Sequence, residues 1–230
     1  MIDVENVQPE AESYETPTTV ERPKLRSGRT LRRDVIETVV LIVIVYTLVN
    51  LSTVRAIVYG PSMEPNFYTG QLVIVNRFAY YFSGPARGDV VVLHNPLSQC
   101  RNAAPDDKSC ELLIKRVVGL PGESVQIKGG RVYINGTMLD EPYVTEFCKG
   151  CDSTDNGWSL KPDEYFVLGD NRNNSWDGHS FGPIPRALIE GQAWIRYWPP
   201  KDATIIPHPS YGAIAAQPPA VAPTPTTALK

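Results

Sequence analysis

The stretch SVQIKGGRVYINGTML, residues 124–139, contains two hairpin signals in immediate succession. Gly129-Gly130 and Asn135-Gly136 each stand between short runs in which apolar and polar side chains alternate. Alternation with a period of two is typical of a strand with one buried face, and both dipeptides favour tight hairpin turns. The stretch therefore predicts antiparallel strands, and we expect a small inserted β subdomain at about residues 124–163.

Similar β-branched runs lie on both sides of this stretch. They occupy residues 71–78, 89–94, 112–118, 164–168 and 192–198. Glycine and proline residues separate the runs, and few of the segments have a helical period. The predicted fold class is therefore mainly β, with antiparallel sheets and hairpins, in a domain at residues 56–203.

Ahead of this domain lies an uncharged apolar segment, TVVLIVIVYTLVNLSTV, at residues 38–54. A helix of about 20 apolar residues spans a bilayer, so we predict one transmembrane anchor at residues 35–55. A buried β segment is an alternative, but strands rarely exceed about 10 residues. A cleaved secretory signal is another, but its charged start would be unusually long and no convincing cleavage site follows.

The basic residues around the apolar segment are distributed unequally. Arg55 is isolated on its C-terminal side, whereas the N-terminal side carries Lys24, Arg26, Arg29, Arg32 and Arg33. The positive-inside rule then predicts a cytoplasmic N-terminus and an extracytoplasmic domain. Composition predicts disorder in both tails, at residues 1–34 and, where Pro, Ala and Thr dominate, at residues 204–230.

The charge balance argues against one class of partner. The net charge is −3, with 22 basic and 25 acidic residues. Such a chain has no excess of positive charge to bind phosphates. We therefore do not expect nucleic acid as a partner.

All the cysteines lie in the predicted extracytoplasmic region, where disulfides persist. Cys100 and Cys110 bracket a polar loop and suit a local disulfide. Cys148 and Cys151 form a C-x-x-C motif, which suits a tight disulfide, a redox pair, or half of a zinc site that the other two cysteines complete. The spacing leaves these alternatives open.

Ser62, in the turn-like GPSMEP segment, and Lys115, in the apolar LLIKRVV run, form a candidate catalytic pair. A serine hydroxyl becomes a good nucleophile only when a base removes its proton, and the chain has only 3 histidines. A lysine can be that base where burial lowers its pKa. Adjacent strand residues point to opposite faces, so we expect Lys115 or Arg116 to point inward. Taken alone, Ser62 could also be an ordinary turn residue, and Lys115 could occupy a strand position that faces water.

A dense polar cluster, GDNRNNSWDGHSFG at residues 169–182, follows a predicted strand. Alone, it is compatible with turns or with a calcium loop. It lacks, however, the regularly spaced carboxylates of an EF-hand.

Taken in order, these segments resemble the bacterial type I signal peptidases in their short, single-anchor form. The resemblance covers about residues 35–200 and includes the anchor, the Ser-Met box at 62–63, the KRVVGLPGE box at 115–123 and the GDNR box at 169–172. It implies a membrane-anchored endopeptidase, without a cofactor or metal, that removes signal peptides from exported proteins. The implied partners are secretory preproteins and membrane lipid.

The resemblance also implies roles for individual residues. Ser62 would attack the scissile carbonyl, and Lys115 would act as general base and then protonate the leaving amine. Ser175 matches a serine whose hydroxyl orients the lysine. Further supporting positions are Asp177, Asp170, Asn171, Arg172 and Arg116.

Two positions depart from the family pattern. Some members carry an oxyanion-donating serine where this chain has Gly60, as many single-anchor members do, so backbone N–H groups would carry more of that role. The family's Asp-Ser-Arg ending is here Asp177-Gly178-His179. Because histidine is not permanently charged, an ion pair between His179 and Asp177 would depend on pH.

Substrate choice is implied by small apolar pockets that accept alanine-like residues at the first and third positions before the cut. The family match assigns Met63, Leu113 and Ile114 to the surroundings of these pockets. The substrate would bind as an extended strand beside the Lys115 segment. The aromatic run FAYYF at residues 78–82 suits either the lipid interface or ordinary core packing.

Two other functions compete with this interpretation. A self-cleaving Ser/Lys repressor shares this catalytic chemistry but needs a DNA-binding N-terminus in place of the anchor. A catalytically inactive, membrane-anchored interaction module would use the cysteine-bearing loops and the Pro-rich tail. The presence of both Ser62 and Lys115 argues against the module.

Overall fold

The computed structural model describes residues 28–97, 112–153, 156–209 and 211. The chain divides into two units, residues 1–45 and 46–230. All the strands described below belong to the second unit.

Helix α1 (Gly28–Ser52) contains most of the apolar segment, residues 38–52. Its part from Arg32 to Ser52 has a mean hydropathy of 2.2 and is long and apolar enough to cross a membrane. At the C-terminal end, the hydroxyls of Ser52 and Thr53 both donate to the Val49 carbonyl, at 2.9 Å. Residues 53–55 then begin the first strand, so the predicted anchor extends too far at its C-terminal end.

A large antiparallel sheet contains the catalytic candidates. In spatial order its strands are β1 (Thr53–Ile57), β2 (Leu72–Asn76), β11 (Ile189–Trp198), β3 (Val90–Leu93), β4 (Leu113–Gly119), β9 (Glu164–Leu168) and β10 (Ile184–Pro185), and β12 (Thr204–Ile205) pairs with β11. The pairs β2–β11, β11–β3 and β4–β9 join strands that are far apart in sequence. The sheet thereby brings the Ser62, Lys115 and 169–182 segments together.

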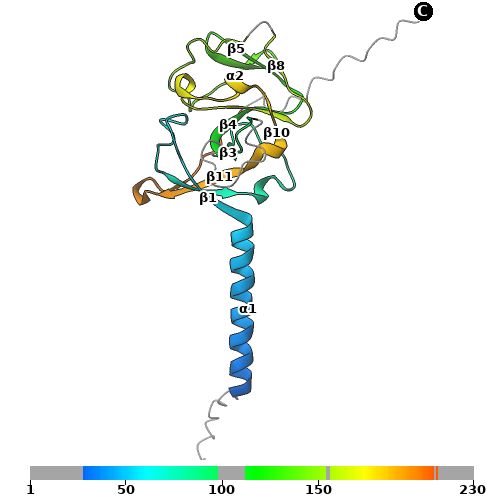
Figure 1. Ribbon diagram of the computed structural model, residues 1–230, viewed down its shortest axis with the longest axis vertical. Helices are drawn as coiled ribbons and strands as arrows, with labels where there is room; N and C mark the ends of the chain where they lie inside the picture. The colour runs from blue at the N-terminus through cyan, green and yellow to red at the C-terminus, as the bar shows by residue number, and fades with distance from the viewer. Residues whose placement is uncertain (1–27, 98–111, 154–155, 210, 212–230) are drawn as a thin grey trace, which may run out of the picture. The chain divides into compact units, whose positions relative to one another are not determined.

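A smaller sheet of four strands holds the two hairpins, in the order β7 (Thr137–Met138), β6 (Arg131–Ile134), β5 (Ser124–Lys128) and β8 (Trp158–Ser159). It lies at the end of the domain opposite β1 (Figure 1). Gly129, Gly130, Asn135 and Gly136 all have positive φ angles, as tight hairpin turns require. The prediction of a mainly β, antiparallel fold behind one apolar helix is therefore confirmed.

Short helical segments complete the described chain. They are η1 (Phe78–Tyr80), η4 (Arg172–Asn174), α2 (Gly178–Phe181), η5 (Arg186–Leu188) and η6 (Pro200–Asp202). The polar cluster at 169–182 thus forms a loop with η4 and α2, directly after β9.

The C-terminal end of the domain lies beyond the predicted boundary at residue 203. Residues 204–205 form β12 against β11, and Tyr211 is buried in the core cluster that contains Val118 and Phe166. The prediction of disorder from residue 204 was therefore wrong for residues 204–209 and 211, because apolar and aromatic side chains within the Pro-rich stretch pack onto the domain. The predicted disorder at residues 1–34 was likewise wrong for residues 28–34, which form the start of α1. The remaining predicted disorder, at 1–27, 210 and 212–230, lies outside the described residues.

Candidate active site

Ser62 lies in a turn between β1 and β2 that begins at a glycine with a positive φ. Gly60 has φ +74°, a conformation that favours glycine. The GDNR loop holds this turn from the other side. The Asn171 N–H donates to the Ser62 carbonyl at 3.0 Å, and the Asn171 side-chain amide donates to the Pro61 carbonyl at 3.1 Å.

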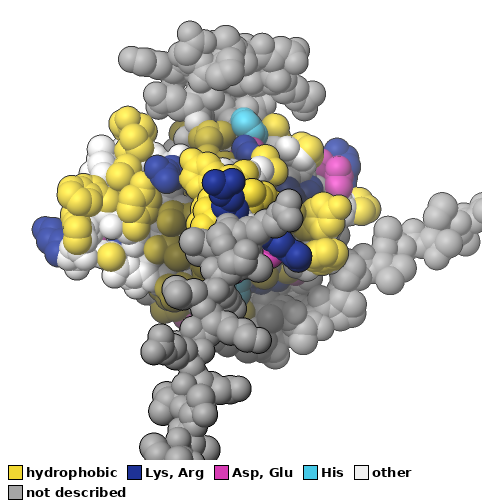
Figure 2. Space-filling view, turned by 90° about the horizontal axis from the view of Figure 1, so that it is seen from below, with side chains coloured by type: hydrophobic (Ala, Val, Ile, Leu, Met, Phe, Trp, Pro, Cys, Tyr) yellow, Lys and Arg dark blue, Asp and Glu magenta, His cyan; other side chains and the backbone are white. Residues whose placement is uncertain are grey.

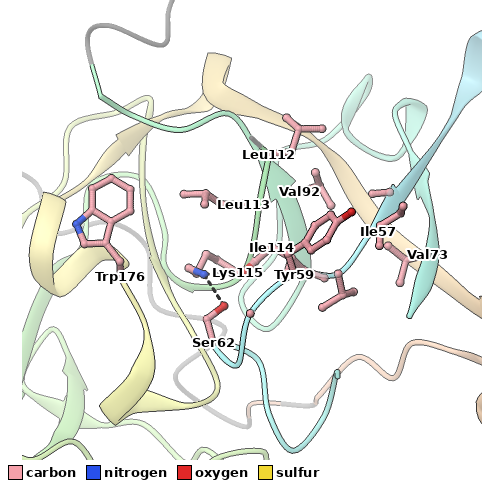
Figure 3. Close-up of a pocket in the computed structure, with 13 residues that line it drawn as sticks. Ile57, Tyr59, Ser62, Val73, Val92, Leu112, Leu113, Ile114, Lys115 and Trp176 are labelled. Atoms are coloured by element: carbon pink, nitrogen blue, oxygen red, sulfur yellow. Dashed lines mark hydrogen bonds between the residues drawn. The ribbon is translucent and has the colours of Figure 1, made fainter. Parts of the chain in front are cut away.

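Lys115 lies on β4 and points at the serine. Its Nζ donates to Ser62 Oγ at 2.8 Å and to the Ile114 carbonyl at 3.0 Å, the first of which is drawn in Figure 3. Lys115 is only 3% exposed. Burial lowers the pKa of its amine from 10.5 to about 8, while the negative charges of Asp177 and Asp170 act in the opposite direction.

The neighbouring Arg116 is also buried, although only one of the two basic residues was expected to point inward. Its guanidinium forms two hydrogen bonds with the Asp170 carboxylate, at 2.8 and 2.7 Å, and a third with the Gly88 carbonyl at 2.8 Å. Asn66 donates to the same carboxylate at 2.9 Å. A fully paired arginine can be buried on the other side of the strand, so this pair forms part of the framework.

Ser175 reaches the site through a contact that only glycine permits. A Cβ atom at Gly169 would overlap both Ser175 Oγ and the Ser62 carbonyl oxygen. Ser175 Oγ is buried and has no hydrogen-bond partner among the described residues. The predicted hydrogen bond from Ser175 to the Lys115 amine is therefore not formed in this structure, in which the amine donates to Ser62 and Ile114 instead.

Asp177 is fully buried behind this contact. Its Oδ2 accepts a hydrogen bond from the Gly169 N–H at 2.7 Å, and its Oδ1 lies 2.7 Å from Nδ1 of His179. The pKa of the His179 imidazole is raised, chiefly by this hydrogen bond, while burial and the charge of Arg172 oppose the rise. The contact between Asp177 and His179 is thus present even though the family's arginine is missing.

Two framework residues have partners that the sequence reasoning missed. Arg172 is buried against Glu141 and donates to its Oε2 at 3.0 Å. Asn66 joins Asp170 to the loop after β7 by donating also to the Tyr143 carbonyl at 2.9 Å. No sequence signal marks these partners, because Glu141 and Asn66 lie far along the chain from the cluster at 169–182.

A pocket of about 300 Å³ opens beside Ser62 and Lys115. Figure 3 shows apolar side chains on one side of the pair and Trp176 on the other. The labelled apolar residues that line it are Ile57, Tyr59, Val73, Val92, Leu112, Leu113 and Ile114.

Two of the three predicted pocket residues, Leu113 and Ile114, line this pocket. Met63 does not; it is fully buried in the hydrophobic cluster that also contains Val73 and Ile114. Its side chain supports the wall from inside the core and does not line the pocket itself. Trp176 was missed, although it directly follows Ser175 in the polar cluster.

The C-x-x-C motif forms a disulfide between Cys148 and Cys151. Both sulfurs lie near the Arg172 carbonyl oxygen, at 3.5 and 3.9 Å. The Lys149 N–H donates to the Asn173 side chain at 2.8 Å, so the disulfide loop packs directly on η4. Among the described residues no group of His, Cys, Asp and Glu side chains is arranged to hold a metal ion; Cys100 and Cys110 lie outside them.

The arrangement can carry out acyl transfer. It combines a hydroxyl in contact with a buried amine, a pocket lined mainly by apolar side chains, and a hydrogen-bonded polar loop beside both. A family model described as signal peptidase, peptidase S26, matches residues 32–198.

The chain belongs to this signal peptidase family.

Two relatives agree with this assignment, and one solved structure is also similar in sequence. Signal peptidase I of Leptolyngbya laminosa is 42% identical over 154 residues, which cover 65% of this chain and 71% of the relative. The probable signal peptidase I-2 of Synechocystis sp. (strain ATCC 27184 / PCC 6803 / Kazusa) is 34% identical over 186 residues, 80% of each chain. A crystal structure of a signal peptidase I from Enterococcus faecalis V583 has 28% identity and a TM-score of 0.36, over 48% of this chain and 97% of that one.

As a signal peptidase, the chain is a serine endopeptidase that acts on secretory preproteins and removes their signal peptides. This membership favours the signal peptidase interpretation over the self-cleaving repressor and the inactive interaction module.

Proposed function

We propose that this signal peptidase works through a Ser/Lys dyad, with Ser62 as nucleophile and Lys115 as general base. The observation that carries the proposal is the 2.8 Å contact between Lys115 Nζ and Ser62 Oγ. A general base has to lie within hydrogen-bond reach of the proton it removes. Burial supports the second requirement, a neutral amine, because it lowers the pKa of Lys115 to about 8.

In the acylation step, Ser62 Oγ bonds to the scissile carbonyl carbon while its proton passes to Lys115 Nζ. The Ser62 N–H is a candidate donor to the resulting oxyanion, because no backbone carbonyl of the described residues accepts it. Lys115 then returns the proton to the leaving nitrogen as the C–N bond breaks. In deacylation, a water molecule attacks the ester carbonyl while Lys115 takes its proton. Lys115 returns that proton to Ser62 Oγ as the ester C–O bond breaks.

Two substitutions and one control test the dyad. The full-length protein in detergent is incubated with a preprotein, and Ser62→Ala and Lys115→Ala are compared with Lys128→Ala, an exposed lysine on β5. Both dyad variants should lose cleavage by at least about a thousandfold, whereas Lys128→Ala should retain it. Cleavage that survives either dyad substitution would refute the mechanism.

We also propose that cleavage follows an Ala-x-Ala-like site. The pocket of about 300 Å³ is small, and branched aliphatic side chains form most of its wall. The backbone beside it has room for an extended peptide, since β4 pairs with β3 from Leu113 but with β9 only from Arg116 onward. One edge of Leu113–Lys115 therefore lacks a neighbouring strand among the described residues and can bind a substrate strand.

A substrate series tests this specificity. Each methylene group that a pocket excludes changes discrimination by about 1–3 kcal/mol. Leucine in place of alanine immediately before the cut should therefore reduce kcat/KM by at least about a hundredfold. Equal cleavage of the alanine and leucine substrates would contradict the assignment of the pocket.

We further propose that α1 anchors the enzyme with residues 1–34 in the cytoplasm and the catalytic domain outside. The unequal basic residues on the two sides of the helix support this orientation. Protease added to intact spheroplasts should then digest the β domain that follows α1. Complete protection of that domain, with digestion only after lysis, would indicate the opposite orientation and refute the proposal.

The catalytic domain also exposes apolar surface suited to lipid. Hydrophobic side chains, those of α1 among them, make up much of the described surface seen in Figure 2. In the aromatic run at 78–82, Tyr80 is buried, but Phe78, Tyr81 and Phe82 are exposed and their rings contact one another. Phe82 is 95% exposed, which favours contact with the membrane interface over core packing.

A further inference from the structure

The buried aspartate of the site carries a titratable group on its outer side. Asp177 is 0% exposed, whereas the His179 side chain that contacts it is 24% exposed. The Asp177 carboxylate therefore acts on two basic groups with different access to water. One is His179, in direct contact, and the other is Lys115, whose proton Asp177 helps to retain.

The charged groups that face His179 are few among the described residues. Asp177 attracts its proton, and the buried guanidinium of Arg172 opposes it. Arg172 is itself paired with Glu141. On the ring's other nitrogen, Nε2 lies 3.2 Å from the hydroxyl of Ser180, a group that stays uncharged. Asp177 is therefore the strongest partner of the imidazole.

Asp177 is also connected to the nucleophile by contacts through Gly169. Its Oδ2 holds the Gly169 N–H, and Gly169 lies against the Ser62 carbonyl and Ser175 Oγ. A change in the charge balance at Asp177 therefore reaches both members of the proposed dyad: the amine through its electric field, and the serine through Gly169.

We propose that His179 is a positioning residue whose own protonation controls how firmly Asp177 holds the proton on Lys115. The inference rests on the proposed Ser/Lys dyad. When the imidazole is charged, it offsets the carboxylate, and the amine releases its proton more readily. When the imidazole is neutral, the carboxylate acts on the amine unopposed. A proton on His179 therefore disfavours a proton on Lys115, and the enzyme retains more of its active, neutral amine as the medium becomes acidic.

Substitutions at position 179 separate charge from hydrogen bonding. His179→Asn keeps a hydrogen-bond donor for Asp177 but is always neutral. His179→Arg is always charged. A matched control is His208→Asn, because His208 also contacts a buried aspartate, Asp89, at 2.9 Å but does not line the pocket beside Ser62.

The experiment measures kcat/KM of the full-length enzyme in detergent, with a preprotein substrate, from about pH 5.5 to about pH 9. His179→Asn should fall roughly threefold to tenfold below the wild type at the acidic end and equal it at the alkaline end. His179→Arg should keep the wild-type activity at the acidic end, and His208→Asn should follow the wild type throughout. Thermal unfolding of each variant checks that it is folded.

A purely structural role of His179 would lower kcat/KM of His179→Asn by the same factor at every pH, and that result would overturn the proposal. Profiles of kcat/KM against pH that coincide at acidic pH in all the variants would also overturn it. Failure of the dyad itself is distinguishable, because Lys115→Ala would then remain active. An independent readout is the NMR titration of the His179 ring, which by reciprocity should shift to higher pH in Lys115→Met; an unchanged titration would also overturn the proposal.

Discussion

Replacing Lys115 by methionine should stabilise the protein while abolishing its activity. Methionine has a similar length and fills the buried space of the lysine side chain without a charge. In the wild type, burial lowers the pKa of the amine from 10.5 to about 8. That difference corresponds to about 3 kcal/mol of free energy, which is the cost of keeping the charged amine in the folded site.

This cost depends on pH in a defined direction. Below about pH 8 the amine is charged in both the folded and the unfolded chain, so the folded wild type bears the whole cost. Between about pH 8 and pH 10.5 the folded chain releases its proton before the unfolded chain does, and the cost disappears. The advantage of Lys115→Met should therefore be larger at pH 7 than at pH 10.5 by about 3 kcal/mol.

Urea unfolding in detergent, followed by tryptophan fluorescence, measures this difference at both pH values. Lys128→Met, at an exposed position of β5, is the control, and its effect should be the same at both. Other titrating groups are common to all the variants and cancel in the comparison. A Lys115→Met advantage that changes by less than about 1 kcal/mol between the two pH values would show that the folded site does not hold Lys115 at a lowered pKa.

Three further changes have defined outcomes. Gly169→Ala should destabilise the fold by about 1–3 kcal/mol, because its Cβ would overlap the Ser62 carbonyl and Ser175 Oγ. It should lower kcat and change KM less. A variant with the wild-type kcat and melting temperature would contradict this contact. The double substitution Cys148→Ser/Cys151→Ser should lower stability by about 2 kcal/mol. It should also reduce kcat, because the disulfide loop packs on η4. Calorimetry measures the first effect and kinetics the second, and an unchanged kcat would show that the disulfide loop does not influence the site. Phe82→Ser should leave stability and cleavage of a soluble peptide unchanged but slow the processing of a preprotein in vesicles by roughly threefold to tenfold, and equal effects on the two substrates would argue against contact of Phe82 with lipid.

Local patterns in the sequence predicted much of the fold. The Gly-Gly and Asn-Gly turns specify hairpins through backbone conformation alone, and both hairpins of the small sheet formed as expected. The apolar segment specified a helix by length and composition. Its C-terminal end was misplaced because Thr53–Arg55 are compatible with either state, and pairing with β2 decides for the strand.

The site was predictable only where the chemistry is carried by unusual residues. A lysine among aliphatic residues and a serine in a glycine-containing turn can be recognised in the sequence. Their contact depends on the order of strands in the sheet, which the sequence alone does not reveal. The sequence could not show that Met63 packs behind the pocket wall, because adjacency to Ser62 does not say which way a turn directs the next side chain. Glu141 was invisible, since its role follows only from the position of Arg172 in the folded loop.

The packing of Tyr211 has a practical consequence for work on the soluble domain. Its ring lies where a side chain on Gly88 would extend, and its hydroxyl donates to that of Tyr143 at 3.2 Å. A chain cut at residue 203, where composition alone places the domain end, would lose β12 and would open the core beneath this ring. The chain should therefore be truncated, or fused to a C-terminal tag, only after residue 211.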